Sequence, residues 1–199
     1  RLSQETPLVV IRQRYKNTSF ISTAKEIGDK IFGMQEGQVN HFFYATSNKR
    51  YKFIRATDTD GINDGIITVT MDGNQPAYSS TSSWSTQVID AIKAASSSID
   101  LSSYDLDGDG FIGRAELQIV VVVTGDELSS SSSNYGVWAH VSGKTNGWKI
   151  GTVRIGALEQ GAAKSKYATF GEQLYGRAAP IGVMAHELGH SALNLTDLY

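Results

Sequence analysis

The sequence predicts a single α/β or α+β domain, and three observations support this fold class. Apolar runs typical of strands alternate with runs typical of helices along all 199 residues. No linker marks a second domain, and no repeat of about 20–50 residues is visible, which excludes a solenoid or propeller. Hydrophobic residues make up 40% of the chain, which is enough for a substantial core. We therefore expect one domain that spans residues 1–199.

Charge and composition exclude several classes of protein. The chain has 18 basic and 20 acidic residues, a balance that predicts neither a nucleic-acid nor an anionic-membrane partner. The longest apolar stretch, around Ile119–Val123, is far shorter than the ~20 residues of a membrane span. Cysteine is absent, which excludes disulfides, thiolate metal ligands and a cysteine nucleophile. The chain opens at Arg1 without a start Met, so we expect a removed leader or a piece of a longer protein.

A strand followed by a helix is predicted at the start of the chain. Leu8–Ile11 is a short run of apolar, mostly β-branched residues and indicates a buried strand. Ser22–Phe32 places Ile27 and Ile31 one turn apart, and Gly33 follows as a stop signal, so a helix is expected there.

A second helix and two strands should follow. Val39, Phe42 and Phe43 have i, i+3, i+4 spacing, which predicts a helix with an aromatic inner face. Tyr51–Arg55 alternates apolar and basic residues, as a half-exposed strand does, and Ile66–Met71 shows a similar pattern.

The middle of the chain should contain a loop, a helix and the main core strand. Asn74–Thr86 is rich in Ser and Thr and indicates a loop, with Ser85 or Thr86 capping a helix that buries an apolar stripe from Val88 to Ala95. Leu117–Thr124 is the strongest strand pattern in the chain.

The last part should add a surface loop, a strand and a final helix. Ser129–Ser133 is of low complexity and indicates a surface loop. Lys149–Ile155 is predicted to be a strand. Pro180 is expected in the first turn of a helix that runs from Ile181 to about Leu193.

The final helix carries the motif His-Glu-x-x-His, formed by His186, Glu187 and His190. Residues four apart lie on one helical face, so both imidazoles can bind one Zn²⁺. Glu187 would then act as the general base on a zinc-bound water that attacks a carbonyl carbon. A chance match on a solvated face is disfavoured, because the first helical turn is otherwise apolar and would leave these polar groups without partners.

A catalytic zinc usually has three protein ligands. Among the nine residues after His190, Asp197 is the only acidic or imidazole side chain. A turn must bring Asp197 back toward the zinc, and Asn194 is the expected pivot because Asn tolerates the left-handed conformation.

A twelve-residue acidic segment, Asp105–Glu116, fits the pattern of a calcium-binding loop. Acidic residues occupy positions one, three and five, Gly occupies position six and Glu position twelve. The predicted Ca²⁺ ligands are Asp105, Asp107, Asp109, Phe111 through its backbone carbonyl, and Glu116. A plain Asp-Gly turn is the alternative. A strand follows where a signalling EF-hand would need a helix, so we expect a structural calcium clip.

The remaining histidines, His41 and His140, have weaker patterns. His41 lies on the predicted aromatic helix and is interpreted as a core or cap residue. His140, in the tripeptide Trp138-Ala139-His140, could line a cleft, but a structural role is favoured.

Taken in order, these motifs resemble the immune inhibitor A family of secreted bacterial zinc metallopeptidases, relatives of the metzincins. The resemblance spans most of the chain, from the Leu8–Ile11 strand to Asp197, and is most specific at Gly182–His190 and at the acidic loop. It implies a zincin/metzincin-like catalytic domain, with a twisted mixed sheet and an active-site helix. It also implies a secreted, extracellular endopeptidase that is made as a precursor and acts on protein or peptide substrates.

Residue by residue, the resemblance implies that His186, His190 and Asp197 bind zinc and that Glu187 is catalytic. Two departures stand out. Leu193 occupies the place of the family's usual Gly, and Asp197 follows one residue late, which an insertion at Asn194 would reconcile. No Met follows the zinc helix, so we expect that the C-terminal subdomain is missing and that a propeptide and a C-terminal remainder belong to the same precursor.

Two hypotheses from different classes follow. The first is a calcium-stabilised zinc endopeptidase that hydrolyses peptide bonds. The alternative is a non-catalytic calcium-binding surface module that retains a decayed peptidase fold. A zinc hydrolase acting on non-peptide amides is a third option that the chemistry allows.

Overall fold

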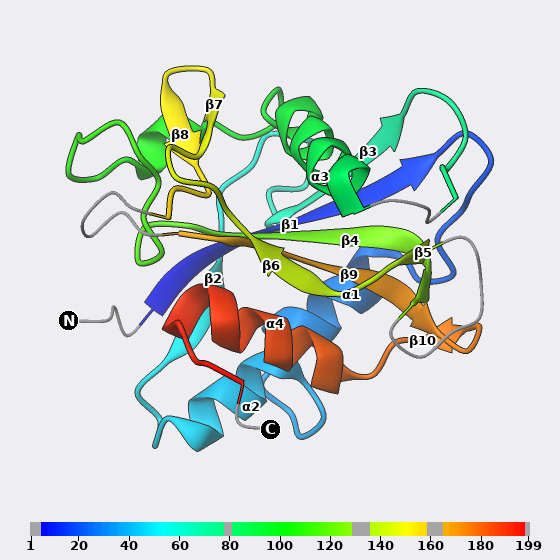
Figure 1. Ribbon diagram of the computed structural model, residues 1–199. Coiled ribbons are helices and arrows are strands. Elements are labelled where there is room, and N and C mark those ends of the chain that lie inside the picture. Colours follow the sequence, from blue (N-terminus) through cyan, green and yellow to red (C-terminus); the bar gives the residue numbers. More distant parts are fainter. Residues whose placement is uncertain (1–4, 78–80, 129–135, 159–164, 198–199) are drawn as a thin grey trace.

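The computed structural model describes residues 5–77, 81–128, 136–158 and 165–197. They form three layers, with a mixed β-sheet between two layers of other elements (Figure 1). One face of the sheet, here the α3 face, is covered by α3 and the hairpin β7–β8; the other, here the α4 face, is covered by α1, α2 and α4. These elements are α1 (Ala24–Phe32), α2 (Val39–Thr46), α3 (Thr81–Ala95), β7 (Trp148–Ile150), β8 (Val153–Ile155) and α4 (Ile181–Leu193).

The main sheet has eight strands, and most of its pairs are parallel. β1 pairs in parallel with β2, β3 and β4, and β4 pairs in parallel with β5 and β9, whereas β6 and β10 run antiparallel to β9. β6 therefore lies at the edge of the sheet, beyond β9. The strands are β1 (Glu5–Tyr15), β2 (Lys52–Arg55), β3 (Ile66–Met71), β4 (Gln118–Glu127), β5 (Gly136–Val137), β6 (His140–Ser142), β9 (Tyr167–Leu174) and β10 (Arg177–Ala178).

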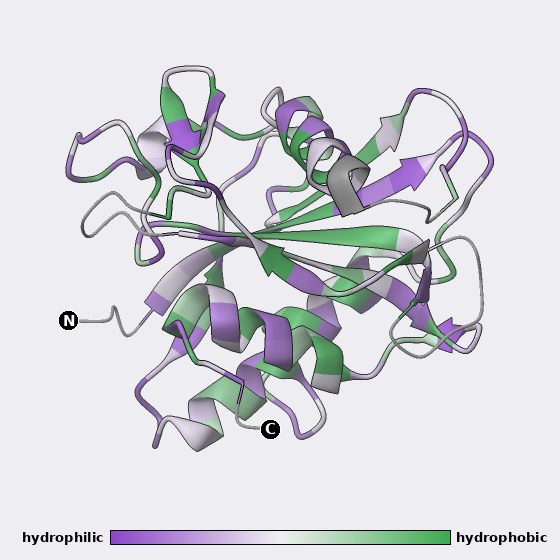
Figure 2. Ribbon diagram, viewed as in Figure 1, coloured by the Kyte–Doolittle hydropathy of each residue, from purple (hydrophilic) through white to green (hydrophobic). Residues whose placement is uncertain are grey.

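Two separate apolar cores form because neighbouring side chains on a strand point to opposite faces. Val9 and Val121 pack on the α3 face with the apolar stripe of α3. Val10 and Val120 pack on the α4 face with α1, α2 and α4. Figure 2 shows β4 as an apolar strand along the middle of the sheet. Burial on both faces explains why β4 is continuously apolar in sequence.

Most of the predicted elements are confirmed, including a mixed α/β fold. The strands at Leu8–Ile11, Ile66–Met71 and Leu117–Thr124 correspond to β1, β3 and β4. The predicted first, second and last helices correspond to α1, α2 and α4. Thr23 caps α1 in a reciprocal capping box with Glu26, which is why this helix begins at residue 24.

Four details of the sequence interpretation are wrong. Helix α3 begins at Thr81, before the predicted caps Ser85 and Thr86. Phe42 is 43% exposed, so only Phe43 belongs to the inner aromatic face of α2. Pro180 is the N-cap of α4 and not its first helical residue. The predicted strand Lys149–Ile155 is the antiparallel hairpin β7–β8. The predicted loop Ser129–Ser133 lies outside the described residues.

The end of β4 contains a β-bulge that redirects its side chains. Val123 and Asp126 are three residues apart on β4, but they pair with residues only two apart on β9. Gly125, inside this stretch, has a φ of 100°. One extra residue moves every following side chain to the opposite face of the sheet. Glu127 thereby reaches the α4 face, on which helix α4 packs.

Among the described residues, none of the helices has both the length and the apolar character required to cross a membrane.

Candidate functional site

Helix α4 presents its motif because its opposite side is buried. Met184 and Leu188, one turn apart, are fully buried in the core of the α4 face. The spacing of His186 and His190 places both imidazoles on one side of the helix. The helix ends at Asn194, which has a φ of 55° and a ψ of 36°, the left-handed conformation that the sequence predicts.

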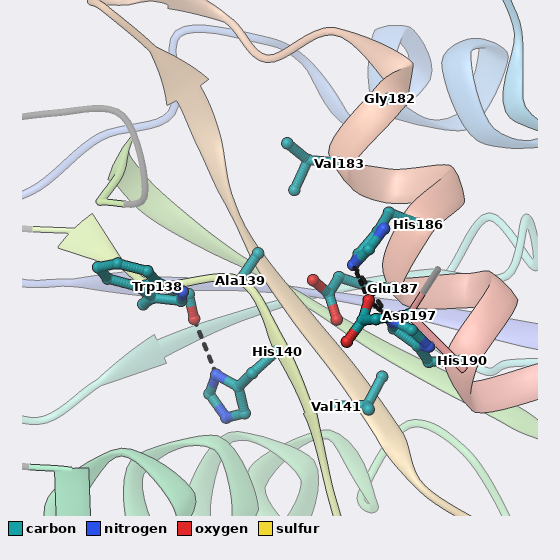
Figure 3. A pocket seen from close by; sticks show the side chains of 10 residues that line it. All are labelled: Trp138, Ala139, His140, Val141, Gly182, Val183, His186, Glu187, His190 and Asp197. Carbon is teal, nitrogen blue, oxygen red and sulfur yellow. Dashed lines mark hydrogen bonds and ion pairs between the residues drawn. The ribbon is translucent and has the colours of Figure 1, made fainter. Parts of the chain in front are cut away.

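The turn after α4 brings Asp197 back to the two histidines. The backbone N–H of Asn194 donates to the His190 carbonyl at 3.1 Å, and that of Leu195 donates to the Gly189 carbonyl at 3.2 Å. These bonds fold the chain back over the last turn. Asp197 Oδ1 consequently lies 3.4 Å from His186 Nε2 and 3.1 Å from His190 Nε2. Figure 3 shows the three side chains pointing toward one another.

The spacing of these three groups fits a metal ion. The Nε2 atoms of His186 and His190 are 3.0 Å apart. In a tetrahedral zinc site with bonds of roughly 2.0–2.1 Å, ligand atoms lie about 3.3 Å apart. His190 Nδ1 donates to the Leu195 carbonyl at 2.7 Å, which orients the ring so that Nε2 faces the other two groups. The residues that the sequence predicts as zinc ligands therefore converge with suitable donor atoms.

Glu187 is buried beside this cluster. Its side chain is 6% exposed and points toward the edge strand β6 (Figure 3). Burial raises the pKa of Glu187 to about 7; the charge of His190 opposes this, whereas Glu127 and Asp197 add to it. A carboxyl group with such a pKa can both accept and release a proton near neutral pH.

A pocket of about 590 Å³ opens over these four side chains. Its walls come from two elements that are far apart in sequence, α4 and the edge of the sheet at β6 (Figure 3). On the α4 side, Gly182 and Val183 line the pocket together with the His-Glu-x-x-His residues, which are called the zinc-motif residues below. On the opposite side the pocket is lined by the β6 wall, which consists of Trp138, Ala139, His140 and Val141.

The β6 wall is fixed by a buried carboxylate. Glu127 is fully buried, and its carboxylate accepts the N–H of Ala139 at 2.7 Å and that of Gly171 at 3.1 Å. Gly171 is required at this crossing, because a Cβ there would lie 2.7 Å from the backbone nitrogen of Glu127. The β-bulge of β4 thus places the buried carboxyl group of Glu127 against the β6 wall, which faces Glu187.

His140 is one of the residues that line the pocket, but its ring is directed away from helix α4 (Figure 3). His140 pairs with Thr169 on β9, and its ring packs edge-on to Tyr167, with centroids 6.2 Å apart. Its Nδ1 lies 2.8 Å from the Trp138 carbonyl. The ring points away from the zinc-motif residues (Figure 3). The structural role favoured by the sequence agrees with this geometry.

The acidic loop also gathers part of its predicted ligand set. Side-chain oxygens of Asp105, Asp107 and Asp109 lie within 4.8 Å of one another. Asp105 Oδ2 accepts the Gly110 N–H at 3.0 Å, whereas its Oδ1 is buried and has no hydrogen-bond partner in the described part of the chain. Such an orphaned oxygen beside two other carboxylates fits a cation.

Glu116 and Phe111 do not belong to that group of neighbouring oxygens. The Glu116 carboxylate accepts the N–H groups of Leu106 at 2.8 Å and Gly113 at 2.6 Å, so it closes the loop through hydrogen bonds. Phe111 forms an isolated parallel bridge with Arg154 of β8. The bonds of this bridge use Gly110 and Ile112, and not the Phe111 carbonyl.

Sequence reasoning missed two residues of the site. Trp138 entered only as part of a tripeptide, and Glu127 was not considered. Two acidic residues, Asp126 and Glu127, that follow the apolar run Ile119–Val123 within four residues are the signal that could have identified Glu127.

Comparison of the chain with protein-family models, with curated proteins and with solved structures gave no match.

Proposed function

We propose that this chain is the catalytic domain of a zinc-dependent endopeptidase, with His186, His190 and Asp197 as zinc ligands and Glu187 as the general base. The observation that carries the proposal is the convergence of three ligand atoms, with separations of 3.0 to 3.4 Å, beside a buried carboxylate in an open pocket. A zinc ion bound there would act as a Lewis acid, lowering the pKa of a bound water to about 7 and polarising a carbonyl.

The chain's own residues have separate tasks in this reaction. His190 is oriented by its Nδ1–H bond to the Leu195 carbonyl, which directs Nε2 toward the ligand cluster. The Glu187 carboxylate takes a proton from the attacking water and then gives it to the nitrogen of the leaving amine. A peptide substrate would bind in the pocket between α4 and β6.

A structural Ca²⁺ in the acidic loop belongs to the same proposal. Asp105, Asp107 and Asp109 would hold the ion, together with the Phe111 carbonyl and Glu116 after rearrangement of its hydrogen bonds. Ile112 of this loop is buried in the core, and its N–H donates to the Arg154 carbonyl at 2.8 Å. Ordering the loop would therefore also support the hairpin β7–β8.

The motif order and the three-layer fold are compatible with a metzincin-related enzyme of the immune inhibitor A type. On that reading the protein is secreted by a bacterium, acts on proteins or peptides, and matures from a precursor with a propeptide and a C-terminal remainder.

The decisive experiment is the substitution Glu187→Gln, assayed for casein hydrolysis and for bound zinc. The amide cannot accept the water's proton, so activity should fall by at least 10²–10⁴-fold while zinc content stays at the wild-type value. Glu36→Gln, on the exposed surface, is the control and should keep both. Unchanged hydrolysis by Glu187→Gln at equal zinc content would refute the mechanism.

A further inference from the structure

Trp138 is the largest side chain of the pocket wall opposite α4. It is 50% exposed, which is a high value for an indole that lines a pocket. In Figure 3 its ring lies at the far end of the pocket from His190. A substrate that spans the pocket from the zinc-motif residues along β6 would reach this ring.

The backbone that carries Trp138 is held on both sides. The Trp138 carbonyl lies 2.8 Å from His140 Nδ1, and the following N–H, of Ala139, donates to the buried Glu127 carboxylate at 2.7 Å. The preceding carbonyl, of Val137, accepts the Leu128 N–H at 2.9 Å. The backbone from which the indole projects is therefore fixed, so a ligand that packs against the ring does not need to order this part of the main chain.

The surroundings of the ring select the kind of group that would bind. Val183 on α4 and Val141 on β6 add apolar surface to the same pocket. A flat indole face gains most from a large apolar or aromatic side chain.

We propose that Trp138 is a specificity-determining residue that binds a large apolar side chain of the substrate close to the cleaved bond, and that Glu127 positions it. This inference rests on the proposed peptidase function and adds the substrate class. Trp138 contacts the substrate, whereas Glu127 acts only through the backbone of Ala139.

Cleavage-site mapping tests the assignment. Zinc-loaded wild type and Trp138→Ser digest denatured casein, and mass spectrometry identifies the cut bonds. Wild type should prefer large apolar residues at one fixed position relative to the cut, and Trp138→Ser should lose this preference. For two peptides that differ only by Phe or Ser at that position, the ratio of kcat/KM values should fall by about tenfold or more. Ile62→Ala, which removes an exposed apolar side chain outside the pocket, should keep the ratio.

Glu127→Gln separates positioning from general structural damage. It should lower the same Phe-to-Ser ratio without loss of zinc, whereas a merely structural defect would lower kcat/KM for both peptides by one common factor. A common factor would overturn the role of Glu127. An unchanged wild-type preference in Trp138→Ser, or no positional preference in wild type, would overturn the role of Trp138.

A binding measurement keeps this inference distinct from the proposed function. In a Trp148→Phe background the buried Trp84 contributes little to acrylamide quenching, so the signal reports on Trp138. N-acetyl-phenylalaninamide should protect Trp138 from the quencher, and N-acetyl-serinamide should not. If zinc-loaded protein cleaves no casein, the peptidase proposal fails, yet selective protection still supports the apolar subsite. Equal protection by both probes overturns it.

Discussion

Glu127→Gln should destabilise the fold by an amount that the structure allows us to estimate. The carboxylate is fully buried and accepts two N–H groups, from Ala139 at 2.7 Å and from Gly171 at 3.1 Å. Glutamine keeps one acceptor oxygen but turns an NH₂ group toward the other N–H. A buried donor left without an acceptor costs about 1–3 kcal/mol, so we expect a loss of about 2 kcal/mol.

The assay is thermal unfolding followed by circular dichroism. For a domain of about 200 residues, 1 kcal/mol shifts Tm by about 2–4 °C, so Glu127→Gln should unfold about 4–8 °C below wild type. Asp29→Asn removes a carboxylate from the exposed pair Lys25–Asp29 and should shift Tm by only about 1 °C. A Tm for Glu127→Gln as close to wild type as that of the control would show that Glu127 does not anchor the β6 wall.

Three further predictions concern the metals and alkaline pH. His186→Ala and His190→Ala should each reduce the zinc content measured by elemental analysis; wild-type zinc in both variants would exclude the proposed site. At a hundredfold excess over its Kd, calcium should stabilise the native state by about 2.7 kcal/mol and thereby raise Tm. The double variant Asp107→Ala, Asp109→Ala should abolish that rise without changing the zinc content. Burial raises the pKa of Tyr15 to about 12, so between about pH 10 and 12 the native state keeps a proton that the unfolded state releases. Stability should therefore fall as pH rises through this window, by up to about 2–3 kcal/mol, and Tyr15→Phe should weaken the fall in urea-unfolding midpoints; an equal fall in the variant would contradict the assignment.

The elements that sequence predicts correctly are those whose signals are local. The apolar runs of β1, β3 and β4 and the 3.6-residue period of α1 and α4 depend only on which faces are buried. The left-handed Asn194 and the i, i+4 histidines are equally local, and they suffice to bring the three proposed zinc ligands together. This part of the site could therefore be derived without knowledge of the fold.

The elements that sequence misses depend on tertiary context. β9 lies inside the sheet, but Thr169, Gly171 and Glu172 interrupt its apolar pattern, and these residues are tolerated because they meet specific partners. Thr169 donates to the Val121 carbonyl at 3.0 Å, and Glu172 accepts the Ser22 N–H at 2.7 Å.

The two residues of the pocket wall discussed above, Glu127 and Trp138, could not be predicted from the sequence either. The role of Glu127 depends on the extra residue near Gly125, because only that bulge turns the side chain to the α4 face. Trp138 and α4 are more than 40 residues apart in sequence and meet only because β6 returns antiparallel along β9. Periodicity carries no information on either event.

The parallel pairing of distant strands has a consequence for how the protein refolds. β4 pairs with β1, which lies about a hundred residues earlier, and with β9, which lies about fifty residues later. Each pairing requires closure of a long loop, and the entropy of that closure is lost before the strand contacts can stabilise the chain. Domains rich in such contacts fold in about milliseconds to seconds. Until both neighbours have docked, β4 exposes an almost unbroken run of Val and Ile. We therefore expect yield on refolding to fall as protein concentration rises, through association of chains at this strand.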